Sequence, residues 1–259
     1  MGPAHTMKPM PTCLSHEVPV WSALLRPQID RRLEEVFAAL PQTEVVQAAR
    51  YVVQGGGHRW RGLMAVAAGL IFRSDAEETV LPLAAALEMV HAASLVLDDL
   101  PSMDHAQMRR GKPCVHVVYP QWVVDLLPAF LVNLAYQTLA GHTGVPEGCR
   151  LRALMWMADM ATCLAYGQEL DLKRVPASAS EAELMECHAL KSGSLFVASL
   201  VGGGILCGAG SGEANVLREA GLKLGQAYQI LDGIADGKAE EGKCTALTLW
   251  GPEEASARA

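Results

Sequence analysis

The feature that most restricts the fold is a long apolar stretch that ends in two acidic residues. Leu81–Leu97 is almost entirely apolar, and Asp98 and Asp99 close it. A transmembrane helix needs about 20 consecutive apolar residues, whereas this stretch is shorter and is interrupted by Glu88 and His91. We therefore expect a helix buried inside a protein, and no membrane-spanning segment.

Helical spacing of apolar residues recurs along the chain, whereas strand-like alternation is hard to find. Pro41 and Pro101 should end helices, because proline lacks the backbone N–H, and Thr43 suits an N-cap. The glycines at 202–204 either permit close helix contact or end a helix. The predicted helices cover residues 29–40, 45–53, 63–71, 80–97, 122–140, 148–172, 180–206 and 212–235. An all-α bundle of antiparallel helices follows.

Composition narrows the class of protein. With 259 residues, we expect a flexible lead-in over residues 1–20 and a single helical domain over 21–259. The net charge of −7 argues against a nucleic-acid partner. Seven cysteines without CxxC spacing indicate free thiols in a reduced compartment. Because residues 1–20 also lack the apolar core of a secretory signal, we expect a cytoplasmic protein.

Acidic and basic groups follow one another closely after the apolar stretch. Asp98, Asp99 and Asp104 supply the oxygen ligands that Mg²⁺ prefers. Arg109 and Arg110 supply cations suited to phosphate. Both together, beside an apolar helix, indicate a metal-bridged diphosphate with an apolar tail. The alternative is a solvated acidic turn followed by a basic helix start.

Several segments carry a family resemblance. Residues 88–104, followed by Arg109-Arg110-Gly-Lys-Pro, resemble the first aspartate-rich region of the trans-isoprenyl diphosphate synthases (polyprenyl synthetases), closest to the farnesyl and geranylgeranyl diphosphate synthases. Four further segments resemble other motifs of that family in the same order: residues 56–61 (Gly-Gly-Lys-Arg-x-Arg), 167–172 (Gly-Gln-x-x-Asp-Leu), 190–193 (Lys-Thr-Gly) and 228–236 (Phe-Gln-x-x-Asp-Asp-x-x-Asp). The resemblance runs from about residue 20 to the C-terminus.

The resemblance implies a helical bundle around a deep apolar cavity, and a Mg²⁺-dependent reaction in which Mn²⁺ could replace Mg²⁺. Isopentenyl diphosphate and an allylic diphosphate would condense to a C15–C20 prenyl diphosphate. The implied catalytic residues are Asp98, Asp99, Arg109, Lys191 and Gln229. The implied metal ligands are Asp98, Asp99, Asp104, Asp171, Asp232 and Asp236. The family also forms dimers, so a homodimer, or a heterodimer with a related synthase, is implied.

The same resemblance implies how the substrates are held. The substrate-binding positions are Gly57, His58, Arg59, His91, Arg109, Arg110, Gln168, Lys191 and Ser192. Chain length would depend on Ala93 and Ser94, the residues five and four positions before Asp98, which are small and leave the cavity open. Met89, one helical turn deeper, would then form its floor.

The chain departs from the family pattern in four places. His58 stands where the family has Lys, and Gly233 stands where the second aspartate-rich motif has Asp. The loop after Asp236 is short, with Lys238 or Lys243 as the nearest cations. The chain also ends at Ala259, where relatives usually continue. Three functions stay open: a synthase, a non-catalytic or modulatory small subunit of a heteromeric synthase, and a terpene cyclase on the same fold.

Overall fold

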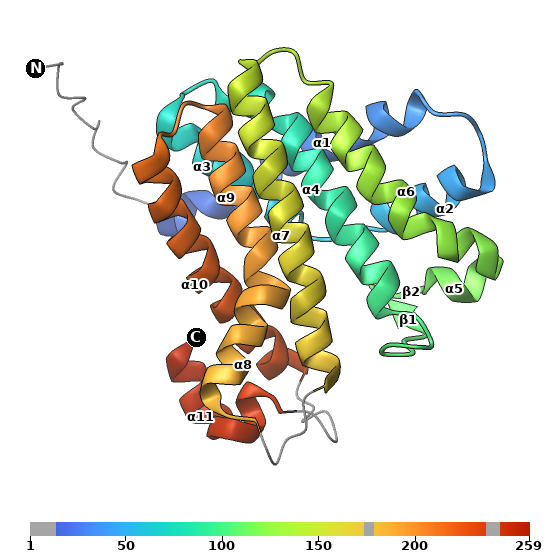
Figure 1. Cartoon of the computed structure of the whole chain (residues 1–259), viewed down its shortest axis with the longest axis vertical. Helices are drawn as coiled ribbons and strands as arrows, with labels where there is room; N and C mark the ends of the chain where they lie inside the picture. The colour runs from blue at the N-terminus through green and yellow to red at the C-terminus, as the bar shows by residue number, and fades with distance from the viewer. Residues whose placement is uncertain (1–13, 174–178, 237–243) are drawn as a thin grey trace, which may run out of the picture.

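The computed structural model describes residues 14–173, 179–236 and 244–259, and it confirms an all-α fold (Figure 1). The helices are α1 (Leu14–Ala38), α2 (Glu44–Val53), α3 (Trp60–Phe72), α4 (Ala76–Asp98), α5 (Val115–Val118), α6 (Gln121–Ala140), α7 (Glu147–Lys173), α8 (Glu181–His188), α9 (Ser194–Leu206), α10 (Ser211–Asp236) and α11 (Ala246–Arg258). A π-helical turn, η1 (Ala189–Gly193), joins α8 to α9. A small antiparallel hairpin, β1 (Met108–Arg109) and β2 (Lys112–Pro113), follows α4.

Local signals explain several helix boundaries. Thr43 caps α2 as predicted, and its side-chain oxygen accepts a hydrogen bond of 3.3 Å from the backbone N–H of Val46. Ser180 and Glu183 form a reciprocal capping box at the start of α8. Thr245 and Thr248 form another at the start of α11. Each box satisfies backbone N–H groups that have no partner inside the helix.

Two predicted segments differ from the structure. Helix α1 begins at Leu14, so residues 14–20 are helical where a flexible lead-in was expected. Residues 1–13 lie outside the described part of the chain. The segment 180–206 was predicted as one helix, but η1 interrupts it between α8 and α9. A π turn adds one residue to the helical repeat and therefore turns the following side chains to a new face.

The core lies where α4 and α9 pass through the bundle. Figure 1 shows α4, α6, α7 and α9 running alongside one another, with α8 and α11 at one end. Every residue of α9 is buried. A Cβ on Gly203 would collide with the backbone carbonyl of Ala65 in α3, so the glycine permits the two helices to touch. A smaller apolar cluster joins Leu184, Ile230 and Ala255 of α8, α10 and α11.

By length and composition alone, three helical stretches of the described chain could cross a membrane, which differs from the expectation that none could. They are Ala76–Asp98, Gln121–Ala140 and Glu181–Leu206. In the first and third, 83% of the most apolar window is buried by the protein itself. In Gln121–Ala140 only 39% of it is buried. Most of this apolar surface therefore belongs to the core, and α6 keeps an uncovered face.

Candidate functional site: an apolar cavity beside acidic and basic groups

A cavity of about 600 Å³ lies among α4, α6 and α7. Its volume falls within the range typical of small-molecule sites. Ala93 and Ser94 of α4 line it, together with Val132 of α6 and Leu164 of α7. The polar lining residues, among them Asp98, come from the C-terminal ends of α4 and α7. The cavity is thus apolar along most of its length and polar at one end, which suits a ligand with an apolar tail and a charged head.

A lysine sits among three carboxylates at the polar end. Lys191 Nζ, contributed by η1, donates a hydrogen bond of 2.8 Å to Asp171 Oδ2 of α7. Burial raises the pKa of the Asp98 carboxyl; the charge of Lys191 opposes this shift, and the charge of Asp104 adds to it. Burial alone would lower the pKa of Lys191, but Asp171 and Asp98 raise it above its ordinary value. The carboxylates therefore attract a cation strongly.

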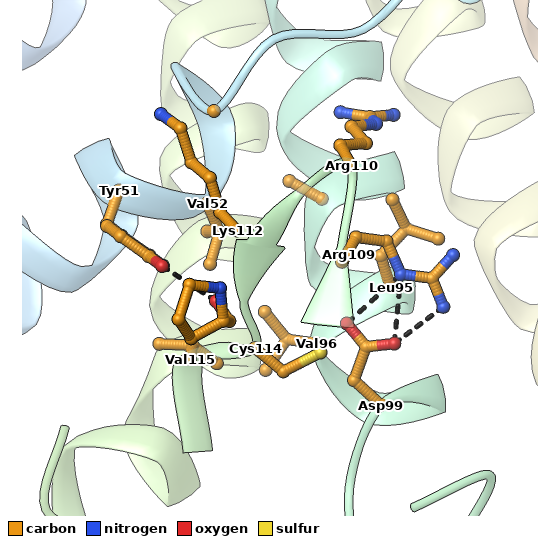
Figure 2. A pocket seen from close by; sticks show the side chains of 13 residues that line it. Tyr51, Val52, Leu95, Val96, Asp99, Arg109, Arg110, Lys112, Cys114 and Val115 are labelled. Carbon is orange, nitrogen blue, oxygen red and sulfur yellow. Dashed lines mark hydrogen bonds and ion pairs between the residues drawn. The ribbon is translucent and has the colours of Figure 1, made fainter. Parts of the chain in front are cut away.

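Asp99 has a different neighbour from Asp98. Arg109 Nε donates to both carboxylate oxygens of Asp99, at 2.9 and 3.1 Å, and its Nη2 donates to Oδ1 at 2.5 Å. Figure 2 shows Arg109 directed at this carboxylate, with the thiol of Cys114 beside it. Burial and the Asp99 carboxylate raise the pKa of the Cys114 thiol to about 11. Both oxygens of Asp99 thus accept from Arg109 in this structure, and its expected role as a metal ligand stays a prediction.

The donor atoms at this end suit Mg²⁺ shared with a phosphate. Among the residues that the structure describes, no three Asp, Glu, His or Cys side chains form a ready cage for a metal ion. Magnesium seldom needs such a cage, since it is usually bound by one or two carboxylates together with substrate phosphates and water. Burial raises the pKa of Asp98 most, and the charge of Asp104 adds to the shift; a divalent cation near both carboxylates would oppose it.

A cluster of basic side chains lies around His91 and Arg61. Arg61 Nη1 lies 3.1 Å from His91 Nε2, and both side chains are buried. A guanidinium can only donate, so Nε2 accepts and the proton of the ring is on Nδ1. Burial, followed by the charges of Arg61 and Arg110, holds the pKa of His91 well below its ordinary value. His91 is therefore neutral and serves as a hydrogen-bonding group among cations.

Arg61 was not among the predicted substrate-binding residues, although the motif at residues 56–61 contains it. Its guanidinium packs on the rings of Phe196 and Tyr228, at 5.5 and 5.8 Å from their centroids. Its Nε is buried and has no hydrogen-bond partner. A buried arginine held on aromatic faces, with donor capacity left over, is suited to an anionic ligand.

The other residues predicted to bind the second diphosphate have different surroundings. Arg110 Nη1 donates to the Gly56 carbonyl at 2.6 Å, and its guanidinium lies where a Cβ on Gly57 would be, so Gly57 and Arg110 are together. His58 is exposed, and its ring centroid is 6.4 Å from that of Trp60. Arg59 is 6% exposed and forms ion pairs with two carboxylates of the protein itself, so its predicted contact with substrate stays a prediction.

Two glutamines were predicted to lie at the site, and their surroundings differ. The amide atoms of Gln168 are buried and have no hydrogen-bond partner, and this residue lines the cavity. An unpaired buried amide costs about 1–3 kcal/mol, so its position indicates a polar ligand. Ser192 donates to the side-chain oxygen of Gln229 and thereby joins η1 to α10.

The second aspartate-rich motif lies near the end of α10. Asp232 is exposed, and its charge acts on Arg61. A Cβ on Gly233 would meet nothing within 4 Å, so no packing requirement explains the glycine. Asp236 ends α10, but its side chain lies outside the description, as do Lys238 and Lys243.

The predicted chain-length residues are partly in place. Ala93 and Ser94 line the cavity as expected. Met89 is fully buried and is not among the lining residues; Val90 lies there instead. The spacing of one helical turn from Ala93 applies to residues 89 and 90 alike, and only the orientation of α4 distinguishes them.

Comparison with known proteins places the chain in a family. Residues 42–247 match the signature of the Polyprenyl synthetase family. The geranylgeranyl diphosphate synthase of Pantoea ananas is 36% identical over 244 residues, which cover 89% of this chain and 80% of that protein. The chloroplastic small subunit of the heterodimeric geranylgeranyl pyrophosphate synthase of Arabidopsis thaliana is 37% identical over 235 residues, which cover 86% and 70%.

The fold agrees with that assignment. The geranyltranstransferase structure from Thermotoga maritima superimposes with a TM-score of 0.80 and 27% identity, covering 92% of this chain and 86% of that one. The synthase structure from Zymomonas mobilis, described as an FPP/GFPP synthase, gives 0.79 and 29%, covering 92% and 88%. With its helical bundle, apolar cavity and matched motifs, the chain belongs to the polyprenyl synthetase family.

Proposed function

We propose that this protein catalyses trans-prenyl transfer, condensing isopentenyl diphosphate with an allylic diphosphate to give a C15–C20 prenyl diphosphate. The observation that carries the proposal is the 600 Å³ apolar cavity whose polar end meets Asp98. A prenyl diphosphate has the same division into an apolar tail and a charged head. The assignment to the polyprenyl synthetase family supports the substrate class.

The difficult step is departure of diphosphate from the allylic substrate, because negative charge develops on its oxygens. Asp98 and Asp104 would hold Mg²⁺, or Mn²⁺, which when bound neutralises that charge. Arg109 and Lys191 would donate to the same oxygens from opposite walls. Gln168, whose amide has no partner within the protein, would contact the substrate near the reacting carbon. These fixed donors need no rearrangement during the reaction, which is what makes them effective.

The second diphosphate would lie against Arg61, Arg110 and neutral His91, where no metal is needed. The Nε–H group of Arg61 has no hydrogen-bond partner within the protein and would donate to this diphosphate. Gly57 leaves room for the guanidinium of Arg110, which any side chain at that position would displace. The double bond of isopentenyl diphosphate would attack the allylic carbon, and loss of a proton would complete the condensation. The elongated tail would then extend past Ser94 and Ala93.

The direct test is turnover of the purified protein with both diphosphates and Mg²⁺. We expect a prenyl diphosphate longer than C10, and a turnover about 100-fold lower in an Asp98→Asn variant that folds normally. Glu35→Gln, on the exposed face of α1, is the control and should retain full activity. A folded wild-type protein without product under any divalent cation would contradict an independent synthase.

A modulatory small subunit is the second candidate. It is favoured by the 37% identity to the small subunit from Arabidopsis thaliana and by Gly233 in place of a motif aspartate. In that case the chain alone would be inactive but would change the product length or rate of a related synthase mixed with it. Asp98→Asn would then leave the effect on the mixture unchanged, since turnover would belong to the partner.

A further inference from the structure

Arg59 has an unusual backbone and an unusual position. Its φ of 57° lies in the left-handed region, which is uncommon for a residue with a side chain. It is the N-cap of α3, yet its own side chain makes no capping hydrogen bond. Such a conformation persists only where surrounding contacts impose it. Those contacts are two carboxylates from other helices.

The first carboxylate is on α1. Arg59 Nε donates to Asp30 Oδ1 at 2.7 Å, and the side chains are 5% and 44% exposed, respectively. The second is on α4, where Glu88 Oε2 lies 3.5 Å from Arg59 Nη1. The other oxygen of Glu88 accepts a hydrogen bond of 3.1 Å from the backbone N–H of Gly62. Glu88 therefore caps α3 from another helix and also binds its N-cap residue.

These contacts determine how α3 meets α4. Arg61 lies two residues after Arg59, at the start of α3, and His91 lies almost one helical turn after Glu88 on α4. Because Glu88 binds both Arg59 and Gly62, it sets the register that brings Arg61 within 3.1 Å of His91. Arg59 donates to the carboxylates of Asp30 and Glu88, whereas the Nε–H group of Arg61 has no hydrogen-bond partner.

From this geometry we propose that Asp30, Arg59 and Glu88 are positioning residues that hold Arg61 against His91 and so shape the second diphosphate subsite. The inference rests on the proposed function, since that subsite belongs to it. It predicts a selective effect: loosening the contacts weakens binding of isopentenyl diphosphate, whereas the allylic diphosphate, held at Asp98 and Lys191, binds as before.

The test is calorimetric titration of isopentenyl diphosphate into the full chain in the presence of a metal chelator, because this subsite needs no metal. Asp30→Asn is the first variant, since Asp30 is half-exposed and its loss leaves the core intact. We expect its dissociation constant to rise about fivefold or more, as small misplacements of binding groups do. Glu35→Gln on the same helix is the matched control and should bind as wild type does.

The selective effect is measured in a parallel titration with a non-hydrolysable allylic diphosphate analogue and Mg²⁺. Equal affinity in wild type and Asp30→Asn is expected there. Glu88→Gln, which keeps an acceptor for the Gly62 N–H but loses the charge, should show the larger loss for isopentenyl diphosphate. Equal losses for both ligands would overturn the inference, because they would indicate general damage.

A readout without any diphosphate separates this inference from the proposed function. In wild type, the imidazole ¹⁵N shifts of His91, assigned with a His91→Gln variant, should show a neutral ring protonated on Nδ1. Asp30→Asn should move the ring toward a mixture of tautomers, as Arg61 leaves Nε2. If wild type does not bind isopentenyl diphosphate, the proposed subsite is wrong. The spectrum alone then tests whether Asp30, Arg59 and Glu88 hold Arg61 against His91. An unchanged spectrum in Asp30→Asn and Glu88→Gln would refute it.

Discussion

Two adjacent aspartates at the end of α4 have different surroundings and so should have different roles. Asp98 lies with Asp104 and Lys191 at the polar end of the cavity. Asp99 is 4% exposed and is bound by Arg109. A carboxylate whose oxygens both accept from an arginine holds that arginine in place. Asp99 would therefore act on the diphosphate through Arg109, whereas Asp98 would act through the metal.

The two roles predict different dependence on Mg²⁺. Asp98→Asn should lower turnover about 100-fold, equivalent to ~2.7 kcal/mol, and should raise the Mg²⁺ concentration needed for half-maximal rate. Asp99→Asn should lower turnover while leaving the Mg²⁺ requirement unchanged, because only Arg109 is released. The measurement is initial rate against Mg²⁺ concentration for each variant. A shifted Mg²⁺ requirement in Asp99→Asn would show instead that Asp99 is a metal ligand.

His91 should make the stability of the protein depend on pH. Burial and the surrounding arginines hold its pKa well below the ordinary value of about 6.5 that applies in the unfolded chain. Between those two values the unfolded chain binds more protons, so stability rises with pH. The stabilisation is complete above about pH 6.5 and is lost as pH falls toward the folded-state pKa.

The check is denaturant unfolding of wild type and His91→Gln at several values between about pH 7.5 and 5.5. Glutamine can still accept from Arg61 but does not titrate in this range. The difference in unfolding free energy between the two proteins should change in favour of the variant as pH falls. Parallel curves would mean that His91 has the same pKa in both states.

Motif matching predicted a cationic segment at residues 56–61 but not the contacts of each residue in it. Arg59, whose φ is 57°, forms ion pairs with Asp30 and Glu88, whereas Arg61 lies beside His91. A left-handed non-glycine residue has no sequence signal of its own. The different contacts of Arg59 and Arg61 therefore needed the structure.

At the scale of elements, one face of α4 forms a wall of the cavity. Val90, Ala93, Ser94 and Asp98 lie along it, over about 12 Å of helix. If a prenyl tail follows this wall, Ala93→Phe should place a ring across its path and shorten the main product by one or more five-carbon units. Met89→Leu should leave product length unchanged, since Met89 does not line the cavity.

Product length is measured by chromatography after removal of the diphosphate. Val90→Ala should have the opposite effect to Ala93→Phe, because it deepens the cavity. The same product distribution in Ala93→Phe and wild type would remove this face of α4 from chain-length control.

Contact between α3 and α9 depends on a glycine. Gly203→Ala should lower the free energy of unfolding by about 1–3 kcal/mol, because its Cβ would press on the Ala65 carbonyl. Gly212→Ala is the matched control on α10, where a Cβ would meet nothing, and should change stability by less than about 0.5 kcal/mol. Both are measured by denaturant unfolding. Equal effects would mean that α9 can shift to accommodate the methyl group.

Element boundaries were predictable where the chain carries proline, glycine or a cap. Thr43 and the periodic apolar residues gave the start of α2 correctly. The hairpin of β1 and β2 was missed because two-residue strands are too short for alternation to be visible. The π turn at Ala189–Gly193 was missed because its composition does not differ from that of an α-helix.

At the scale of the whole molecule, apolar side chains remain exposed on the two long helices beside the cavity. Trp122 and Leu126 of α6 are each 53% exposed, and Leu151 and Met155 of α7 are each 57% exposed. Exposed apolar surface of this kind marks sites of association with another protein. Because α6 is apolar yet mostly uncovered, we expect a second protomer, or a related synthase, to cover it.

A paired substitution, Leu126→Glu with Met155→Glu, should therefore weaken self-association at least about 10-fold, since two buried charges without partners oppose the interface. Val216→Glu is the control: Val216 is 68% exposed and lies on α10, which packs mainly against α9 and not against α6, so dimerisation should be unaffected. Sedimentation equilibrium over a range of protein concentrations gives the association constant for each form. A wild-type chain that stays monomeric throughout that range would exclude the homodimer.

The same residues would then be tested by adding a related synthase. A modulatory subunit should form a mixed dimer with it, and the paired substitution should abolish that dimer.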